Sequence, residues 1–314
     1  MRVLGNPPRN ATLDLAIGIA GLWLAAGFMW DSWAHLHVGI ESFFTPYHAV
    51  FYSAMLVGAA ALGLAAVANG RKGYSGRHVL PAPYQRALLG VPIFFLGGLG
   101  DLMWHSVFGV EDRVEAVTSP THLIIGLGVV VFLSGPIGSA LENRAKLTTL
   151  WDQLPLVFSL ATVLEFVHLG TSYAFDPAAA AAFAPPPALA QSADYFTATT
   201  LSLYKAGSGV IIVIFQSLVV AGFAIWLTTR FKMAFGAFAL LFFLGEVMLA
   251  AALANDTPML TIHACMALAA GLVADILVMR RNPQAANMRA LRYFGMLVPA
   301  TYFAIYFALT IGLQ

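Results

Sequence analysis

Residues 31–48 read DSWAHLHVGIESFFTPYH and place one acid and two histidines where an apolar segment ends, a short loop turns and the next apolar segment begins. Asp31 and His35 are four positions apart, so on a helix they share one face. The connection from His35 to His48 leaves room for a turn that returns His48 to their side. A carboxylate and two imidazoles can hold a transition metal, and each is costly at membrane depth without a partner. The segment predicts a metal-binding helical hairpin.

A second stretch repeats this arrangement further along the chain. Asp101 and His105 occur in GDLMWH with the same Asp-x3-His spacing, and His122 follows in SPTH after a loop. His122 comes two positions after Pro120, a residue favoured in the first turn of a helix. The dipole at a helix start favours the neutral imidazole that a metal requires. Two such hairpins favour metal binding over a structural hydrogen bond between one acid and one histidine.

The composition is that of a membrane protein. Hydrophobic residues make up 60% of the 314 residues, charged residues only 10%, and the mean hydropathy is +0.79. A soluble domain has roughly 25% charged residues. The formal net charge of +1 and the lack of a basic tract argue against nucleic acid as a partner. The single cysteine, Cys265, excludes an internal disulfide, a CxxC metal site and a c-type haem attachment.

Apolar segments of about 20 residues are long enough to span a bilayer. We therefore expect an all-α fold, a polytopic bundle of about nine transmembrane helices in a single integral membrane domain over residues 1–314. The first span follows a polar start and is too long for a signal peptide, so we expect it to be retained. The expected spans are 12–35, 46–69, 86–108, 120–141, 151–174, 197–228, 233–253, 258–279 and 291–313.

The basic residues predict the orientation, because short cytoplasmic loops collect Lys and Arg. With nine spans, all of the 16 basic residues except Arg113 and Lys205 fall on one side. We expect a cytoplasmic N-terminus and an outer C-terminus, in the inner membrane of a prokaryote. The acids and histidines of both hairpins then lie toward the outer face.

The chain divides by these features into two parts. Residues 12–142 hold the two metal-ligand hairpins, and residues 143–314 hold five further helices with a proline-rich and alanine-rich outer loop over 175–196. The similarity between the hairpins is limited to the ligand positions, which indicates architectural repetition.

Four further polar residues lie in apolar spans of the second part. Glu165 and His168 have the Glu-x-x-His spacing of di-iron carboxylate bundles, and the alternative is an internal hydrogen bond between them. Glu246 and His263 are as far apart in the sequence as Asp31 and His48. Either each is a core residue with its own hydrogen-bond partner, or the two share a partner, because an unpaired polar group is costly in lipid. We treat these four as additional metal ligands or as residues that support the ligands.

The spacing Asp-x3-His-x12-His at Asp31, His35 and His48 resembles the copper-ligand motif in a membrane subunit of the particulate methane and ammonia monooxygenases, the copper membrane monooxygenase family. A second hairpin of that family carries Asn-x3-His-x13-His, and its counterparts here are Asp101, His105 and His122. This chain has Asp in place of Asn and a longer spacing, Asp-x3-His-x16-His. The resemblance covers about residues 12–142. It implies copper at the first group, a second copper at the other, and oxidation of a small substrate with dioxygen.

These observations favour a membrane oxidoreductase that holds copper, with iron or zinc as alternatives, and oxidises a small or hydrophobic substrate that enters from the lipid. Its expected partners are the bilayer, the substrate, and other membrane subunits or further copies of the chain. One alternative is a b-type haem electron carrier, although haem does not require a carboxylate four positions before a histidine. Another is a transporter or sensor for a metal ion or a proton.

Overall fold

The computed structural model describes residues 5–38, 42–109, 119–171, 195–253 and 257–312, without the side chains of 36, 195–206, 208, 253 and 257. Every regular element in these ranges is helical. The long helices are α1 (Ala11–His37), α2 (Pro46–Gly70), α4 (Gly90–Phe108), α6 (Pro120–Glu142), α7 (Leu150–Gly170), α10 (Tyr195–Arg230), α11 (Ala237–Leu253), α12 (Thr257–Arg281) and α13 (Met288–Gly312). The short elements are η1 (Gly76–Val79), α3 (Ala82–Ala87) and η2 (Arg144–Lys146). Residues 175–194 of the expected outer loop lie outside the described ranges.

Within the described ranges, eight helices are long and apolar enough to cross a membrane, and a ninth apolar helix, Ala237–Ala252, is shorter. The prediction of a helical membrane bundle is confirmed at this level. The expected third span, 86–108, differs in detail, because the chain enters it through the short helix α3 and turns at Leu88 before α4 begins. Large apolar side chains such as Leu64, 72% exposed, and Ile211, 67% exposed, cover the outside of the bundle. Lipid is the environment that suits such a surface.

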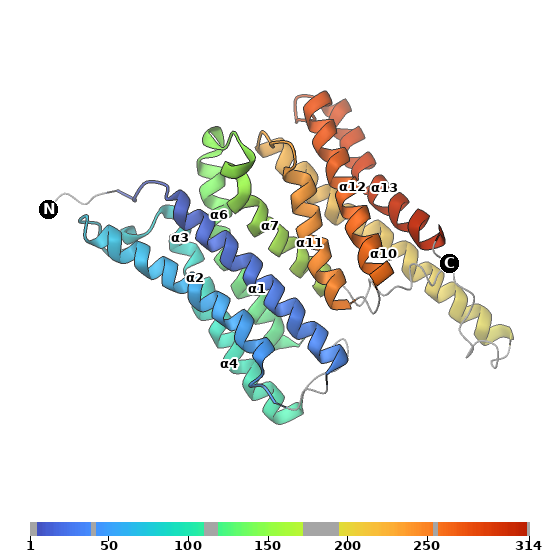
Figure 1. Cartoon of the computed structure of the whole chain (residues 1–314), viewed down its shortest axis with the longest axis horizontal. Helices are drawn as coiled ribbons and strands as arrows, with labels where there is room; N and C mark the ends of the chain where they lie inside the picture. Colours follow the sequence, from blue (N-terminus) through green and yellow to red (C-terminus); the bar gives the residue numbers. More distant parts are fainter. Residues whose placement is uncertain (1–4, 39–41, 110–118, 172–194, 254–256, 313–314) are drawn as a thin grey trace.

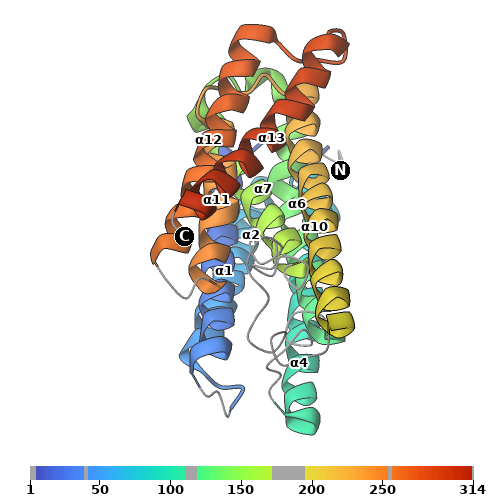
Figure 2. The same ribbon diagram turned by 90° about the vertical axis from the view of Figure 1, so that its right-hand side faces the viewer.

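Successive long helices run in opposite directions, so that the two helices of each hairpin pack against each other (Figure 1). The closest pairs are α1 with α2, α4 with α6, and α11 with α12, and α7 packs on α1, α6 and α11. Figure 2 shows α4 and α6 on one side of the molecule and α1 with α11 on the other. The last turns of α1 and α4 and the first turns of α2 and α6 lie at the same end of the bundle, where α7 and α11 also end.

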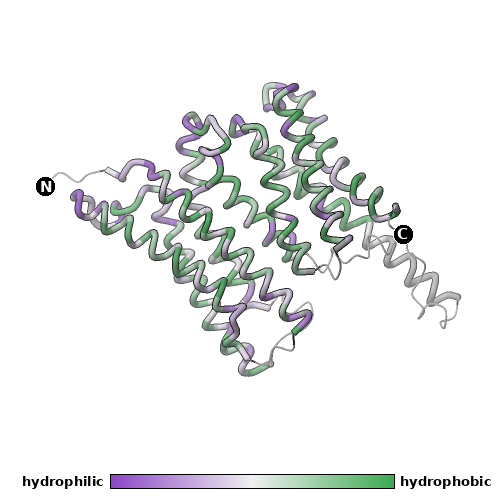
Figure 3. Tube along the Cα trace, in the orientation of Figure 1, coloured by the Kyte–Doolittle hydropathy of each residue, from purple (hydrophilic) through white to green (hydrophobic). Residues whose placement is uncertain are grey.

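The apolar core consists of two clusters of buried side chains. One lies between the first two hairpins and includes Leu24, Phe51 and Phe132, and the other lies among α7 and the later helices and includes Phe238 and Phe294. Helix α7 contributes to both clusters. Figure 3 shows apolar residues along most of each helix and hydrophilic residues concentrated at the helix ends and connections. Buried polar side chains within the bundle are therefore exceptions that need an explanation.

Candidate metal centre

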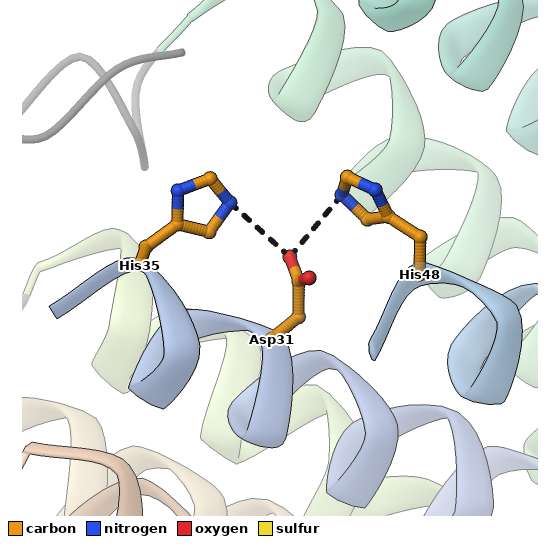
Figure 4. Close-up of side chains that lie close together, drawn as sticks. All are labelled: Asp31, His35 and His48. Atoms are coloured by element: carbon orange, nitrogen blue, oxygen red, sulfur yellow. Dashed lines mark ion pairs between the residues drawn. The ribbon is translucent and has the colours of Figure 1, made fainter. Parts of the chain in front are cut away.

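The first group of predicted ligands forms a buried cluster at the turn between α1 and α2. Asp31 and His35 lie one turn apart near the end of α1, and His48 lies in the first turn of α2. The Nε2 atoms of His35 and His48 are 3.5 Å and 3.3 Å from the same Asp31 oxygen, Oδ2. Both rings turn toward the carboxylate (Figure 4). One ligand atom from each residue lies within 4.8 Å of the other two, which is close enough for one metal ion. We call these residues triad 1.

The second group has the same form at the turn between α4 and α6, and we call Asp101, His105 and His122 triad 2. Nε2 of His105 is 3.5 Å from Oδ2 of Asp101, and Nε2 of His122 is 3.2 Å from Oδ1. Asp101 is 1% exposed, and the hydroxyl of Thr121 donates a hydrogen bond of 2.9 Å to its Oδ1. These three residues also offer ligand atoms within 4.8 Å of one another. The structure thus brings together all six residues of the two predicted hairpin sites.

The start of the second helix in each hairpin fixes the position of its histidine. Helix α2 begins after Thr45, whose hydroxyl accepts a hydrogen bond of 3.1 Å from the backbone N–H of His48. Helix α6 begins after Ser119, whose hydroxyl accepts one of 3.4 Å from the N–H of His122. A proline occupies the first helical position in both. Each histidine is therefore the third residue of a capped helix, a position set by local geometry.

A glycine in the first helix of each hairpin allows the two helices to approach closely. Gly27 comes four positions before Asp31, and Gly97 comes four positions before Asp101. A Cβ at Gly27 would lie 2.8 Å from a backbone nitrogen of α2, and one at Gly97 would lie 2.8 Å from a backbone nitrogen of α6. No side chain fits at that distance, so the close approach requires glycine. The carboxylates one turn further on are thereby held beside the opposite histidines.

Backbone carbonyls orient two of the imidazoles. Nδ1–H of His48 donates to the carbonyl of Phe43 at 2.5 Å, and Nδ1–H of His105 donates to the carbonyl of Gly109 at 3.2 Å. Because a carbonyl only accepts, the proton of each neutral ring lies on Nδ1. Nε2, the nitrogen that faces the aspartate, is then free of hydrogen and able to bind a metal. This arrangement is typical of histidine ligands in metal sites.

Each aspartate also has a buried oxygen that accepts no hydrogen bond in the described part of the chain, Oδ1 of Asp31 and Oδ2 of Asp101. Leaving such an atom without a donor is costly. A cation bound at each triad would remove this cost. The donor set, its burial and the orientation of the rings therefore fit a metal ion.

The two triads are neighbours. The rings of His35 and His105 have centroids 6.4 Å apart, and within the triads the ring centroids are 6.3 Å apart for His35 and His48 and 6.0 Å apart for His105 and His122. The four imidazoles therefore form a continuous row from α2 to α6. Two metal ions bound at the triads would lie close to each other.

A third polar cluster lies among α7, α11 and α12 and contains the other four sequence-predicted residues. Nδ1 of His168 is 3.1 Å from Oε2 of Glu246, and Nδ1 of His263 is 2.6 Å from Oε1. Glu165 is fully buried, and neither of its oxygens accepts a hydrogen bond from a described residue. The alternative of an internal hydrogen bond between Glu165 and His168 is therefore wrong, whereas Glu246 and His263 do pair with each other.

Two tyrosines near these groups were not identified from the sequence. Tyr302 of α13 donates a hydrogen bond to Oε2 of Glu246, a residue of α11. Tyr52 of α2 lines an open cavity of about 670 Å³ between α2 and α4, together with His48, Phe95 and Leu99. The Tyr52 hydroxyl is buried and makes no hydrogen bond within the described ranges. Neither tyrosine has a local sequence signal, because each acquires its role by packing against a distant segment.

The described side chains therefore form two Asp-His-His triads and one cluster of two glutamates and two histidines, all toward the same end of the bundle. The two triads are built from consecutive hairpins, and the third cluster is built from later helices. Comparison with protein-family models, with curated proteins and with solved structures found no match to this chain.

Proposed function

We propose that the chain is a membrane-embedded oxidoreductase that holds copper at triads 1 and 2 and oxidises a small apolar substrate with dioxygen. The observation that supports the proposal most is the pair of buried Asp-His-His groups. In each group a backbone carbonyl accepts a hydrogen bond from Nδ1 of one histidine, His48 or His105, so that Nε2 on the opposite side of the ring faces the aspartate. The resemblance of both motifs to the copper-ligand motifs of the particulate monooxygenases supports the same function.

The donor set favours copper. One carboxylate oxygen and two imidazole nitrogens suit copper, iron and zinc, and among divalent ions copper binds such sites most tightly. Three protein ligands leave coordination positions open for dioxygen or substrate. A bound copper would supply the electron transfer to dioxygen. The residues of the chain would hold the metal, keep Nε2 of both rings directed at it, and exclude water from the aspartates.

The cavity beside triad 1 supports an apolar substrate. It lies between α2 and α4 at the outside of the bundle, and its walls include Phe43, Phe95 and Leu99. His48 lines the same space, so a molecule that enters from lipid comes next to a proposed copper ligand. The hydroxyl of Tyr52, which has no partner among the described residues, would donate a hydrogen bond to an oxygen atom on substrate or product.

The alternatives fit this geometry less well. In each triad the histidine nitrogens converge on an aspartate, which leaves no space between them for a haem. A transport path would continue to the other end of the bundle. There, Asp14 binds Arg9, Tyr84 and Ser139, and Asp275 accepts hydrogen bonds from the first N–H groups of α11. Both acids have structural partners.

The proposed topology has nine crossings, including the short helix α11, in the inner membrane of a prokaryote. The N-terminus is cytoplasmic and the triads lie near the outer face, because all basic residues but Arg113 and Lys205 then lie inside. Electrons would reach the triads from other membrane subunits or from a donor outside the membrane.

The test is elemental analysis with absorption and electron paramagnetic resonance (EPR) spectroscopy of the detergent-purified protein. We expect copper in the wild type, its loss in an Asp31→Ala/Asp101→Ala double variant that elutes as a folded protein, and no Soret band. A His78→Ala variant, which changes a histidine at the other end of the bundle, should keep its copper. Copper retained by the double variant, or a Soret band, would overturn the proposal.

A further inference from the structure

We propose a third metal site, formed by Glu165, His168, Glu246 and His263, that binds a divalent ion such as Fe²⁺, Mn²⁺ or Zn²⁺ and is independent of the copper triads. We call these four residues the Glu-His centre. The observation that carries the proposal is a fully buried carboxylate with no partner among the described residues, next to a second carboxylate that already has three donors around it.

Glu165 is the residue that requires a ligand. It is 0% exposed, and both of its oxygens lack a hydrogen-bond donor in the described part of the chain. A carboxylate without a partner in an apolar interior is strongly destabilising. Glu246 lies close enough for its charge to interact with that of Glu165. Two neighbouring buried carboxylates need either a proton or a compensating positive charge, and a divalent ion supplies that charge.

Glu246 is the centre of the cluster. His168 from α7, His263 from α12 and Tyr302 from α13 all approach its two oxygens. Side chains from three helices therefore converge on one side chain of a fourth. Glu165, which no described donor reaches, lies close enough to Glu246 for the two charges to interact, so an ion that draws the four side chains together would serve both acids.

Close packing of α7 against α11 keeps the two glutamates together. Gly245 directly precedes Glu246, and a Cβ at Gly245 would lie 3.2 Å from the carbonyl oxygen of Ala161 and 3.1 Å from a methyl group of Leu164. Leu164 directly precedes Glu165. The small residue on one helix thus faces the turn that carries the other acid. The two glutamates therefore lie directly beside this close contact.

The donor set differs from that of the triads. Two carboxylates and two imidazoles provide more oxygen than an Asp-His-His triad, and oxygen ligands shift the preference toward iron and manganese. Helical bundles that hold iron use Glu-x-x-His on one helix with a glutamate on a facing helix, the spacing found at Glu165 and His168. The Glu-His centre contains one such motif, which suits a single ion.

The centre shares no ligand with the triads. The ring of Phe28 contacts both His122 of triad 2, at 6.4 Å between centroids, and Phe166, at 5.2 Å. Phe166 is the neighbour of Glu165. Metal binding at the two places can therefore be separated by mutation.

The test uses the full chain with the triads disabled by Asp31→Ala and Asp101→Ala, freed of metal by a chelator and titrated with Mn²⁺ under EPR observation. We expect about one tightly bound Mn²⁺ per chain, displaced by Fe²⁺ or Zn²⁺. Adding Glu165→Gln should remove this binding, whereas Glu142→Gln, the same change at an exposed glutamate, should leave it intact.

No tight Mn²⁺, Fe²⁺ or Zn²⁺ binding in the triad-disabled chain would overturn the proposal, even if the wild type binds copper. Equal binding with and without Glu165→Gln would also overturn it. If Glu165→Gln does not fold, His263→Gln at the partly exposed edge of the centre replaces it, and the same loss of binding is expected. Failure of copper binding at the triads would leave this result unaffected.

Discussion

His35 of α1 and His105 of α4 lie with their rings nearly parallel, 23° apart in plane and 6.4 Å between centroids. Each ring belongs to a different triad, so this contact is where the two proposed copper sites meet. It joins the two hairpins through a direct ring contact, although each hairpin holds its own group of proposed ligands.

The first prediction follows from this contact. When both triads hold Cu²⁺, we expect the EPR spectrum to show coupling between the two spins, because the sites are neighbours. An Asp101→Ala variant should bind about half as much copper and give the spectrum of an isolated ion. Identical uncoupled line shapes in both proteins would show that the two sites are independent.

A second prediction concerns pH. Because an imidazole binds a metal only when it is neutral, protonation of the four triad histidines competes with copper. We expect copper to be retained through dialysis near neutral pH and released progressively on acidification. Equilibrium dialysis at a series of pH values measures the release, and restoring neutral pH with copper present should reverse it.

A third prediction concerns the helix caps. Thr45→Ala should destabilise the protein by about 1 kcal/mol through loss of the cap, and should also weaken copper binding, because the cap positions His48. Thr149→Ala is the matched control, since Thr149 caps α7 at the other end of the bundle. It should lower thermal stability by a similar amount and leave the copper affinity unchanged. Equal copper affinity in both variants would mean that the cap has no part in placing the ligand.

A fourth prediction concerns the helix contact at Gly27. Gly27→Ala places a methyl group 2.8 Å from backbone of α2, so α1 and α2 must separate and triad 1 must widen. We expect a loss of stability and of copper at triad 1. Gly63→Ala on α2, where no atom lies within 4 Å, should instead be neutral or stabilising by about 0.5–1 kcal/mol. Thermal unfolding and copper content measured on both variants separate the two outcomes.

A fifth prediction concerns the cavity. Ala49→Trp fills the space beside His48 and should lower substrate-dependent oxygen consumption without reducing the copper content. Leu64→Trp, at a lipid-facing position of the same helix, is the control and should not affect turnover. Unchanged turnover in Ala49→Trp would show that substrate reaches the triads by another route.

The two triads could be predicted from the sequence because helical geometry fixes where the residues of each first helix lie. Asp31 and His35 share a face wherever the helix forms, and the short connection returns His48 to them. Pro120 before His122 predicted the start of α6, whereas the caps by Thr45 and Ser119, which position both histidines, are found only in the structure.

The arrangement around Glu246 could not be predicted in the same way. Its contacts to His168 and Tyr302 join helices far apart in the chain, and a spacing rule says nothing about which helices pack together. The same limit applies to Tyr52, whose position beside a cavity depends on how α2 meets α4. The Glu-x-x-His spacing placed Glu165 and His168 on one face, but only packing reveals that the histidine pairs with a different acid.

The capped start of each second helix has a consequence for how the hairpins vary. The connection from His105 to His122 is longer than the connection from His35 to His48, yet both triads close with similar distances. The distances between the ligand side chains therefore do not depend on the length of the connecting loop. The connection is therefore where the two hairpins can differ in length and sequence while the ligand positions stay the same.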